Sequence, residues 1–246
     1  MAEHKDKTPS TPQHAVKRSS LALRHIALFQ GLSEDRLEHI ANDCDWHSIA
    51  ARKPLFTRAQ NSNDVYFLAS GRVRVTTYSA QGRQVTFRDC EAGEHFGDLA
   101  ALDGQPRSAD VVTLEPSLLA SLSPAAFRAL LRAEPLVAER VVLYLTALVR
   151  QLSERVIDLS TLGVQNRLHA ELLRLAIATG VQDNQARITP APPHAALASQ
   201  ISTNREQVTR ELGALTRCGL LRKEGRALVV TDVARLTSMV AEVRGA

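Results

Sequence analysis

The sequence predicts an α+β protein of two domains joined by a long helix. Three patterns support this: apolar and polar residues alternate between 46 and 122, a helical pattern continues from 124 to 159, and helix-turn-helix spacing follows near 200. With 246 residues the chain can bury two cores of ordinary size. We expect a flexible tail over 1–18, an N-terminal β-roll over 19–133, a long dimerisation helix over 134–162 and a winged helix-turn-helix domain over 163–246.

Composition limits where the protein works and what it binds. Hydrophobic residues make up 44% and charged residues 23%, as in ordinary globular proteins. The polar tail lacks the apolar core of a secretion signal, and no run of about 20 apolar residues occurs. We therefore expect a cytoplasmic protein with no membrane partner. Cys44, Cys90 and Cys218 are scattered and odd in number, so we expect neither a disulfide framework nor a metal site.

The first domain is expected to open with short helices and continue as strands. Ser33, followed by Glu34, Asp35 and Arg36, is a helix-start signal. The strand pattern then breaks at Ser70-Gly71 and at Gln81-Gly82, which is typical of hairpins in a small barrel or roll. The alternation over residues 73–77 places Val73, Val75 and Thr77 on one face.

A proline at the first turn of a helix, after Ser123, begins the helical region. Within it one stripe has alternating spacings of four and three residues, a heptad seam interrupted only by an arginine. Its members are Val141, Leu145, Leu148, Leu152, Arg155 and Leu159. The stripe either packs on its own roll or joins two copies of the chain. Because four turns exceed what a small domain covers alone, the second interpretation is favoured.

Residues 195–217 have the spacing of a helix-turn-helix. A short helix ends at Gln200, a polar turn follows, and Asn204 can cap a second helix. The apolar residues expected to share one core are Leu197, Ile201, Val208, Leu212 and Leu215. The expected DNA contacts lie at the turn and the N-terminal half of the second helix: Thr203, Asn204, Arg205, Glu206, Thr209 and Arg210.

A predicted wing and a local charge excess strengthen this DNA-binding hypothesis. Two strands around Glu224-Gly225 form the wing, with Lys223 and Arg226 available for phosphates. From Arg187 to the end, nine Lys and Arg residues face five Asp and Glu residues. The alternative is a solvated helix face with a Glu206–Arg210 pair. The turn, the wing and the charge together favour double-stranded DNA.

The segment EHFGDLAALDGQPRSADVV predicts an anion site. Gly97 lets the backbone bend, and a helical turn beginning at Asp98 favours an anion. Arg107 supplies a cation and Ser108 a hydroxyl donor for a phosphate, while the Asp98 carboxylate can accept from a sugar hydroxyl. The alternative for Arg107 is a surface ion pair with Asp103 or Asp110.

Two segments resemble a known family. FGDLAALDGQPRSA resembles the phosphate-binding cassette of cyclic-nucleotide-binding domains, and TNREQVTRELGALTRCGLL resembles the recognition helix of Crp/Fnr bacterial transcription regulators. The resemblance covers about residues 20–235. It implies a homodimer that responds to cyclic AMP and binds palindromic promoter DNA with TGTGA-like half-sites, with RNA polymerase as a further partner. The implied nucleotide contacts are Phe96, Gly97, Asp98, Leu99, Arg107, Ser108, Leu152 and Ser153.

The sequence departs from the family pattern at four places. Asp98 replaces the usual glutamate, Leu152 replaces the threonine that meets adenine, Ser202 replaces the glycine of the helix-turn-helix bend, and Ala59-Gln60 stands where the roll commonly has Gly-Asp. The alternative regulator therefore responds to cyclic GMP, to a cyclic dinucleotide or to no ligand. A haem sensor is a further alternative, although each histidine is more simply a surface or packing residue. No nucleophile is paired with a base at a recognisable spacing, so we do not expect an enzyme.

Overall fold

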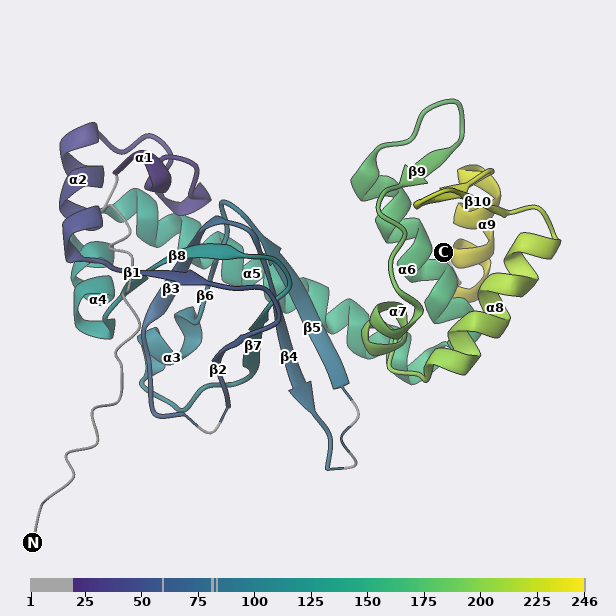
Figure 1. The fold of residues 1–246 in the computed structure, drawn as a ribbon, viewed down its shortest axis with the longest axis horizontal. Helices are drawn as coiled ribbons and strands as arrows, with labels where there is room; N and C mark the ends of the chain where they lie inside the picture. Colours follow the sequence, from purple (N-terminus) through teal and green to yellow (C-terminus); the bar gives the residue numbers. More distant parts are fainter. Residues whose placement is uncertain (1–19, 59, 81, 83, 246) are drawn as a thin grey trace, which may run out of the picture.

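The computed structural model describes residues 20–58, 60–80, 82 and 84–245, and the expected tail over 1–18 lies outside them. Figure 1 shows two bodies joined by one long helix, α5 (Pro135–Thr161). The N-terminal body contains two sheets with helices on one side, and the C-terminal body is mostly helical. The predicted fold class is confirmed.

Short helices open the N-terminal body, as the sequence predicts. They are α1 (Ser20–Leu23), a 3-10 turn (Ala27–Phe29) and α2 (Glu34–Asp43). The Ser33 hydroxyl oxygen accepts a hydrogen bond from the Arg36 amide at 3.3 Å, which caps α2. The rings of Phe29 and Phe67 lie 4.7 Å apart, so these helices share a core with the sheet.

In the described residues the roll consists of two four-stranded antiparallel sheets, in the orders β1-β8-β3-β6 and β2-β7-β4-β5. The strands are β1 (Asp45–Ile49), β2 (Pro54–Phe56), β3 (Val65–Ser70), β4 (Arg72–Tyr78), β5 (Gln84–Glu91), β6 (His95–Phe96), β7 (Asp110–Thr113) and β8 (Ser117–Leu122). The short helix α3 (Asp98–Asp103) lies between β6 and β7. The predicted roll is therefore present, with a turn at Gly71 between β3 and β4.

The expected face of β4 is wrong beyond its middle. Val73 is buried and Val75 is partly buried, but the next buried residue is Thr76 rather than Thr77. In the pairing with β5, Val75 lies opposite Arg88 and Thr76 opposite Thr86, so Phe87 of β5 is an extra, unpaired residue, and the ladder is distorted where the buried face of β4 changes.

Two helices follow the roll. Helix α4 (Pro124–Ala133) is capped by Ser123, and α5 begins at Pro135 after a break at Glu134. The first half of the predicted heptad stripe faces the chain's own roll. Val141 is buried in the roll core, Leu145 packs against that core, and Leu148 faces the space between the roll and α5. Val141 and Leu148 therefore face the chain's own roll, whereas Leu145 also borders the exposed side of α5. A heptad pattern does not reveal which surface a stripe meets, so the dimer seam stays a prediction.

The C-terminal body is a helix-turn-helix with a wing. Its helices are α6 (Val164–Thr179), α7 (His194–Gln200), α8 (Arg205–Arg217) and α9 (Val233–Arg244), and its strands are β9 (Ala186–Ile188), β10 (Leu221–Glu224) and β11 (Ala227–Val230). The Asn204 side-chain oxygen accepts from the Gln207 amide at 2.8 Å and caps α8. All five apolar residues predicted to share a core are buried in one cluster.

The cysteines take ordinary packing positions. Cys44 and Cys90 are buried, while Cys218 is exposed at the end of α8. Burial raises the pKa of both Cys44 and Cys90 to about 12. Within 20–245, leaving aside the three internal gaps, no helix is long and apolar enough to cross a membrane.

Candidate functional site

A pocket of about 240 Å³ lies between the roll and α5. Seven of the eight residues expected to contact a nucleotide line it: Phe96, Gly97, Asp98, Leu99, Arg107, Ser108 and Leu152. The eighth, Ser153, does not, and its hydroxyl donates to the Val149 carbonyl on the exposed side of α5. The fold therefore gathers residues from the Gly97 turn (residues 96–108) against one face of the long helix.

Arg107 is buried, and no carboxylate of the described residues forms an ion pair with it. The residue is 2% exposed, and its guanidinium carbon lies 4.0 Å from the centre of the Phe56 ring. Its Nε and Nη2 donate to the Ser62 hydroxyl oxygen at 3.4 and 3.3 Å, and Nη1 donates to the Gly97 carbonyl at 3.3 Å. These bonds exceed the roughly 2.7–2.9 Å typical of charge-assisted bonds. Burial lowers the pKa of Arg107, so its charge lacks full compensation.

The alternative of a surface ion pair for Arg107 does not hold. Asp110 accepts from the Arg58 amide and Asp103 accepts from the Gln105 amide, each at 2.8 Å. Among the described residues no ion pair involves Arg107. A buried guanidinium whose hydrogen bonds within the described ranges go to neutral oxygens is suited to receive an anion from solution.

Gly97 has both the backbone angle and the space that only glycine allows. Its φ is +82°, and a Cβ at this position would lie 2.7 Å from Arg107 Nη1 and 2.8 Å from the Asp64 carbonyl oxygen. Any side chain would therefore push against the guanidinium as well as strain the backbone.

Asp98 supplies an acceptor in the same pocket. The residue is 4% exposed, and no hydrogen-bond partner of its Oδ2 occurs in the described part of the chain. Burial raises the pKa of Asp98, while the backbone amides of Asp98 and Leu99 oppose the shift. A buried carboxylate oxygen without a donor is costly, so this atom is suited to a hydroxyl group of a ligand.

The rest of the pocket lining comes from residues that sequence reasoning missed. They are Phe56, Val75, Phe87, Arg88, Ala100, Ala109, Val111, Tyr144, Leu148, Gln151 and Arg155. On α5 the spacing of Tyr144, Leu148 and Leu152 is one helical turn each, so this face could have been found from helical periodicity. The residues of β2, β4 and β5 carry no such local signal, because only the tertiary fold brings them to the pocket.

Two of these lining residues, Arg88 and Tyr144, form a small polar cluster with His95. The Tyr144 ring lies 4.3 Å from the His95 ring, and the Arg88 guanidinium carbon lies 5.3 Å from the Tyr144 ring centre. Burial, assisted by the positive charge of Arg88, lowers the pKa of His95 to about 3. Burial also raises the pKa of Tyr144. His95 is therefore neutral and Tyr144 protonated at neutral pH.

The predicted DNA contacts lie on the exposed start of α8. Arg205, Glu206 and Arg210 are exposed, and no Glu206–Arg210 ion pair occurs within the described ranges. Arg210 instead donates to Gln207. The Thr209 hydroxyl donates to the Arg205 carbonyl and lies 2.7 Å from His194 Nδ1, so it is already engaged. The arginines at the start of α8 remain accessible to bases and phosphates.

Ser202 and Thr203 form the bend before α8. Ser202 has a φ of +54°, which agrees with its place in a bend where glycine is usual. Both residues are partly exposed. Because Asn204 caps α8 through its side-chain oxygen, its amide group is the part left for other contacts.

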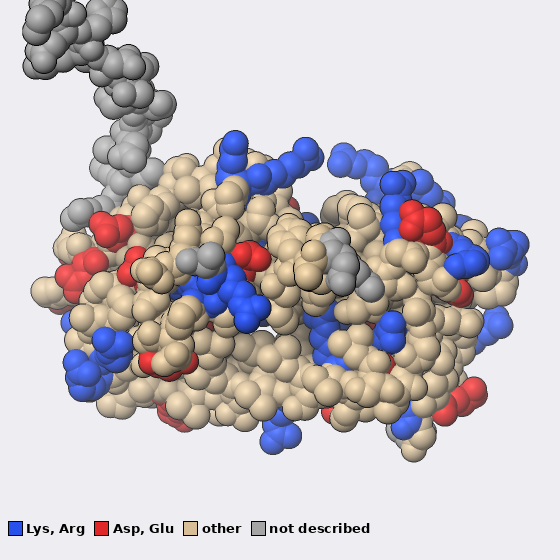
Figure 2. All heavy atoms as spheres, turned by 90° about the horizontal axis from the view of Figure 1, so that it is seen from below, with Lys and Arg blue, Asp and Glu red and all other residues tan. Residues whose placement is uncertain are grey.

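The wing carries two exposed basic residues beside an ion-pair cluster. Lys223 and Arg226 are exposed, whereas Glu224 pairs with Arg187 and Arg222. Figure 2 shows Lys and Arg side chains gathered over the C-terminal body at the right of the view. In the part of the chain that the structure describes, no cluster of three His, Cys, Asp or Glu side chains could hold a metal ion.

Comparisons with known proteins agree with both parts of this arrangement. Residues 46–134 match the family model of the cyclic nucleotide-binding domain, and residues 166–239 match that of the Crp-like helix-turn-helix domain. The cyclic AMP receptor protein of Thermus thermophilus is 30% identical over 212 residues, which cover 85% of this chain and 94% of that protein.

Solved structures share the fold. A CooA mutant from Carboxydothermus hydrogenoformans superposes with a TM-score of 0.72 at 20% identity, covering 81% of this chain and 88% of that one. The c-di-GMP responsive global regulator CLP of Xanthomonas campestris gives 0.68 at 18% identity, covering 80% and 99%. The homologues and both domains are those of transcription regulators and not of enzymes. The chain therefore belongs to the Crp/Fnr family of cyclic-nucleotide-binding, DNA-binding transcription regulators.

Proposed function

We propose that this regulator binds cyclic AMP in the pocket between the roll and α5, with the phosphate on Arg107. The observation that carries the proposal is the buried guanidinium of Arg107, which donates to neutral oxygens and lies in the same pocket as a carboxylate oxygen of Asp98 that has no partner among the residues the structure describes. A cyclic nucleotide offers one anion and one ribose hydroxyl, which match these two groups. Ser108 lines the pocket and supplies a further hydroxyl donor.

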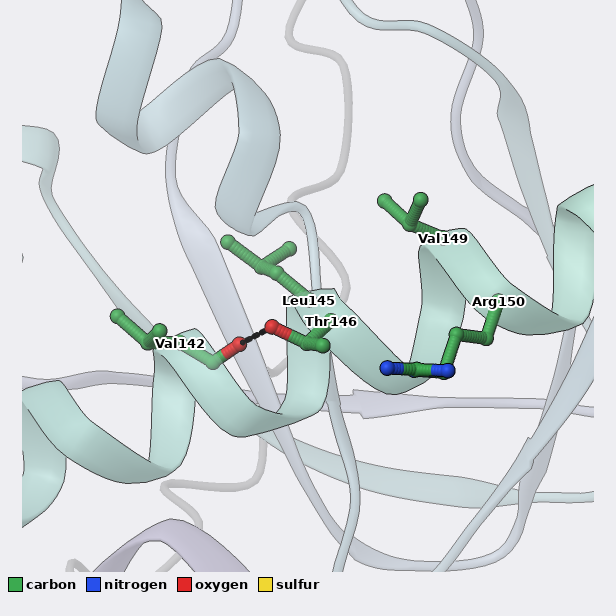
Figure 3. Close-up of a pocket in the computed structure, with 5 residues that line it drawn as sticks. All are labelled: Val142, Leu145, Thr146, Val149 and Arg150. Atoms are coloured by element: carbon green, nitrogen blue, oxygen red, sulfur yellow. Dashed lines mark hydrogen bonds between the residues drawn. The ribbon is translucent and has the colours of Figure 1, made fainter.

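We propose that two copies pair through the side of α5 that faces away from the roll. Val142, Val149 and Val156 are each more than 60% exposed and repeat every seven residues. Figure 3 shows Val142, Leu145, Thr146, Val149 and Arg150 lining a shallow apolar surface on successive turns of the helix. A second α5 covering this stripe would bury the valines and bring the partner's Ser153 towards the pocket.

In such a dimer the two α8 helices would read successive major grooves of palindromic promoter DNA. Support comes from the exposed Arg205 and Arg210 at the start of α8 and from Arg226 on the wing. Arginine can bond both acceptors of a guanine edge, which fits a half-site such as TGTGA.

The phosphate assignment is tested by titrating cyclic AMP into the wild-type protein and Arg107→Gln by calorimetry. Loss of two charge-assisted bonds predicts a rise in Kd of at least roughly 100-fold. Arg128→Gln is the matched control, because Arg128 donates to the Ala101 carbonyl of α3 at 2.7 Å but does not line the pocket. Equal Kd values for wild type and Arg107→Gln would contradict the assignment.

The DNA assignment is tested by fluorescence anisotropy with a labelled palindromic TGTGA duplex, at one fixed salt concentration, with and without excess cyclic AMP. Tighter binding in the presence of the nucleotide is expected, and the ratio of the two Kd values gives the coupling directly. A scrambled duplex is the control for sequence-independent binding.

A second ligand class has specific support. Leu148 and Leu152 make the α5 wall apolar, and Arg88 and Arg155 add two further cations to the pocket. Arginine is well suited to the guanine edge, so cyclic GMP is the first alternative. A regulator of the same fold, CLP, is described as responsive to c-di-GMP. Parallel titrations of cyclic AMP, cyclic GMP and c-di-GMP decide among the three.

A further inference from the structure

The roll and the helix-turn-helix touch through β5 and α7. The hydroxyl oxygens of Thr86 on β5 and Ser199 on α7 lie 2.9 Å apart, and the two residues are 0% and 5% exposed. Figure 1 shows α7 beside the middle of the molecule, where α5 passes from the roll to the C-terminal body. The DNA-binding domain is therefore docked on the same strand that supplies Phe87 and Arg88 to the pocket.

Arg155 of α5 lines the pocket and forms hydrogen bonds with both β5 and α7. Its Nη1 donates to the Phe87 carbonyl of β5 at 3.0 Å, and its Nη2 donates to the Gln200 carbonyl of α7 at 2.6 Å. Both Arg155 and Phe87 line the pocket. One guanidinium thus joins three elements: the long helix, the strand and the end of the first helix of the helix-turn-helix.

The bonded carbonyl lies at the start of the bend that orients the recognition helix. Gln200 is the last residue of α7, and Ser202, with its positive φ, follows two residues later. Arg167 holds the same bend from the other side, because its Nε donates to the Ile201 carbonyl at 3.0 Å and its Nη1 to the Leu162 carbonyl at 2.9 Å. The bend is therefore bonded to α5 through Arg155 and to α6 through Arg167.

We propose that Arg155 is a positioning residue that couples occupancy of the pocket to the orientation of the helix-turn-helix. This inference rests on the proposed function. A ligand that contacts Arg155, or that moves Phe87, changes the geometry of the guanidinium, whose two terminal nitrogens are both committed to carbonyls. Because the fork is planar and rigid, a shift at Phe87 is transmitted to Gln200. If the ligand binds more tightly to one orientation of the helix-turn-helix than to another, the difference in binding free energy is the coupling energy between pocket and DNA-binding domain.

Three variants separate this role from ordinary packing. Arg155→Leu removes both bonds, and Arg155→Lys keeps the charge but cannot reproduce the planar fork. Arg244→Gln is the matched control, because Arg244 of α9 also ties the C-terminal body to α5, through Asp158 at 2.6 Å, and does not line the pocket. Each full-length protein is titrated with cyclic AMP, cyclic GMP and c-di-GMP by calorimetry, and with labelled duplex by anisotropy, with and without nucleotide.

The measured quantity is the Kd for DNA without nucleotide divided by the Kd for DNA with nucleotide. For the wild type we expect this ratio to lie in the typical allosteric range of roughly 5–150. For Arg155→Leu we expect a ratio below about 3. Arg155→Lys should also lose most of the ratio, and Arg244→Gln should keep it. In the ligand-free proteins, hydrogen exchange of the amides of residues 196–203 should rise about tenfold in Arg155→Leu, as expected for the loss of a charged hydrogen bond.

The outcomes distinguish this inference from the proposed function. A nucleotide that binds Arg155→Leu and still changes its DNA affinity by the wild-type ratio overturns the inference alone. A nucleotide that binds the wild type without changing its DNA affinity also overturns the coupling, while the ligand assignment stands. If calorimetry detects no binding of any of the three nucleotides to the wild type, the proposed function and the inference are both overturned.

Discussion

The Gly97 turn of the roll and the Ser202 turn of the helix-turn-helix solve the same backbone problem with different residues. Each holds one residue at positive φ shortly before a helix, with +82° at Gly97 and +54° at Ser202. At Gly97 a Cβ would lie within 3 Å of Arg107 and of the Asp64 carbonyl. At Ser202 a side chain is accommodated and partly exposed.

The difference shows what each turn must preserve. The Gly97 turn surrounds a buried cation whose position depends on contacts at close distance, so both space and backbone angle matter. The Ser202 turn only redirects the chain between α7 and α8, and the charges that it positions are exposed. Serine in that bend therefore costs only backbone strain, of about 1 kcal/mol.

The largest expected effect is that of Gly97→Ala. Backbone strain of about 1–2 kcal/mol and the displacement of Arg107 should lower the free energy of unfolding by about 2 kcal/mol and abolish nucleotide binding. Gly104→Ala is the control, because Gly104 has a φ of +71° and a Cβ there would meet no atom of the described residues within 4 Å. It should lose about 1 kcal/mol and keep its nucleotide affinity, as measured by urea unfolding and calorimetry. Equal nucleotide affinity in Gly97→Ala and Gly104→Ala would show that the Gly97 turn does not need the space around Arg107 for binding.

Acid should weaken the roll through His95, which lies two residues before Gly97. Burial holds the pKa of His95 near 3, so the unfolded chain binds a proton below the ordinary histidine pKa of about 6.5 and the folded chain does not. The free energy of unfolding should therefore fall as the pH drops, by about 2 kcal/mol between pH 6.5 and 5 from this residue. Urea unfolding at both pH values should show a smaller loss in His95→Phe. An identical loss in the variant would mean that His95 is not the responsible group.

Ser202→Gly should have the smallest effect and the opposite sign. Glycine relieves the positive φ but makes the unfolded chain more flexible, so a net gain of about 0.5 kcal/mol is expected. Thermal unfolding measures the change, and the DNA affinity should stay within about twofold because Arg205 and Arg210 keep their places. A loss of stability would show that the Ser202 side chain makes a contact that offsets its strain.

The sequence predicts the Gly97 and Ser202 turns better than it predicts which surfaces α5 contacts. Gly97, Asp98 and Arg107 lie within eleven residues, so the local chain alone brings them to one pocket. Likewise, the cap at Asn204 and the buried Val208 and Leu212 follow from helix periodicity. Such short-range relations depend on backbone geometry that the residue types specify.

The α5 wall shows where this reasoning fails. A heptad stripe identifies an apolar face but not its partner, and Leu148 and Leu152 line the pocket. Arg155, which interrupts the stripe, contacts β5 and α7. Its partners, Phe87 and Gln200, are 68 and 45 residues away in the chain, and their carbonyl groups carry no residue-specific signal. The extra residue Phe87 in β5 is equally invisible to an alternating pattern.

The place of α5 in the chain also sets an order of assembly during synthesis. All strands of the roll precede residue 123, whereas the helix that closes the pocket spans Pro135–Thr161. Because chains are made from the N-terminus, the roll can fold on the ribosome while its binding surface is still open on one side. The nascent protein then gains its closed pocket only after α5 has emerged, and before the DNA-binding domain that follows it can complete its fold.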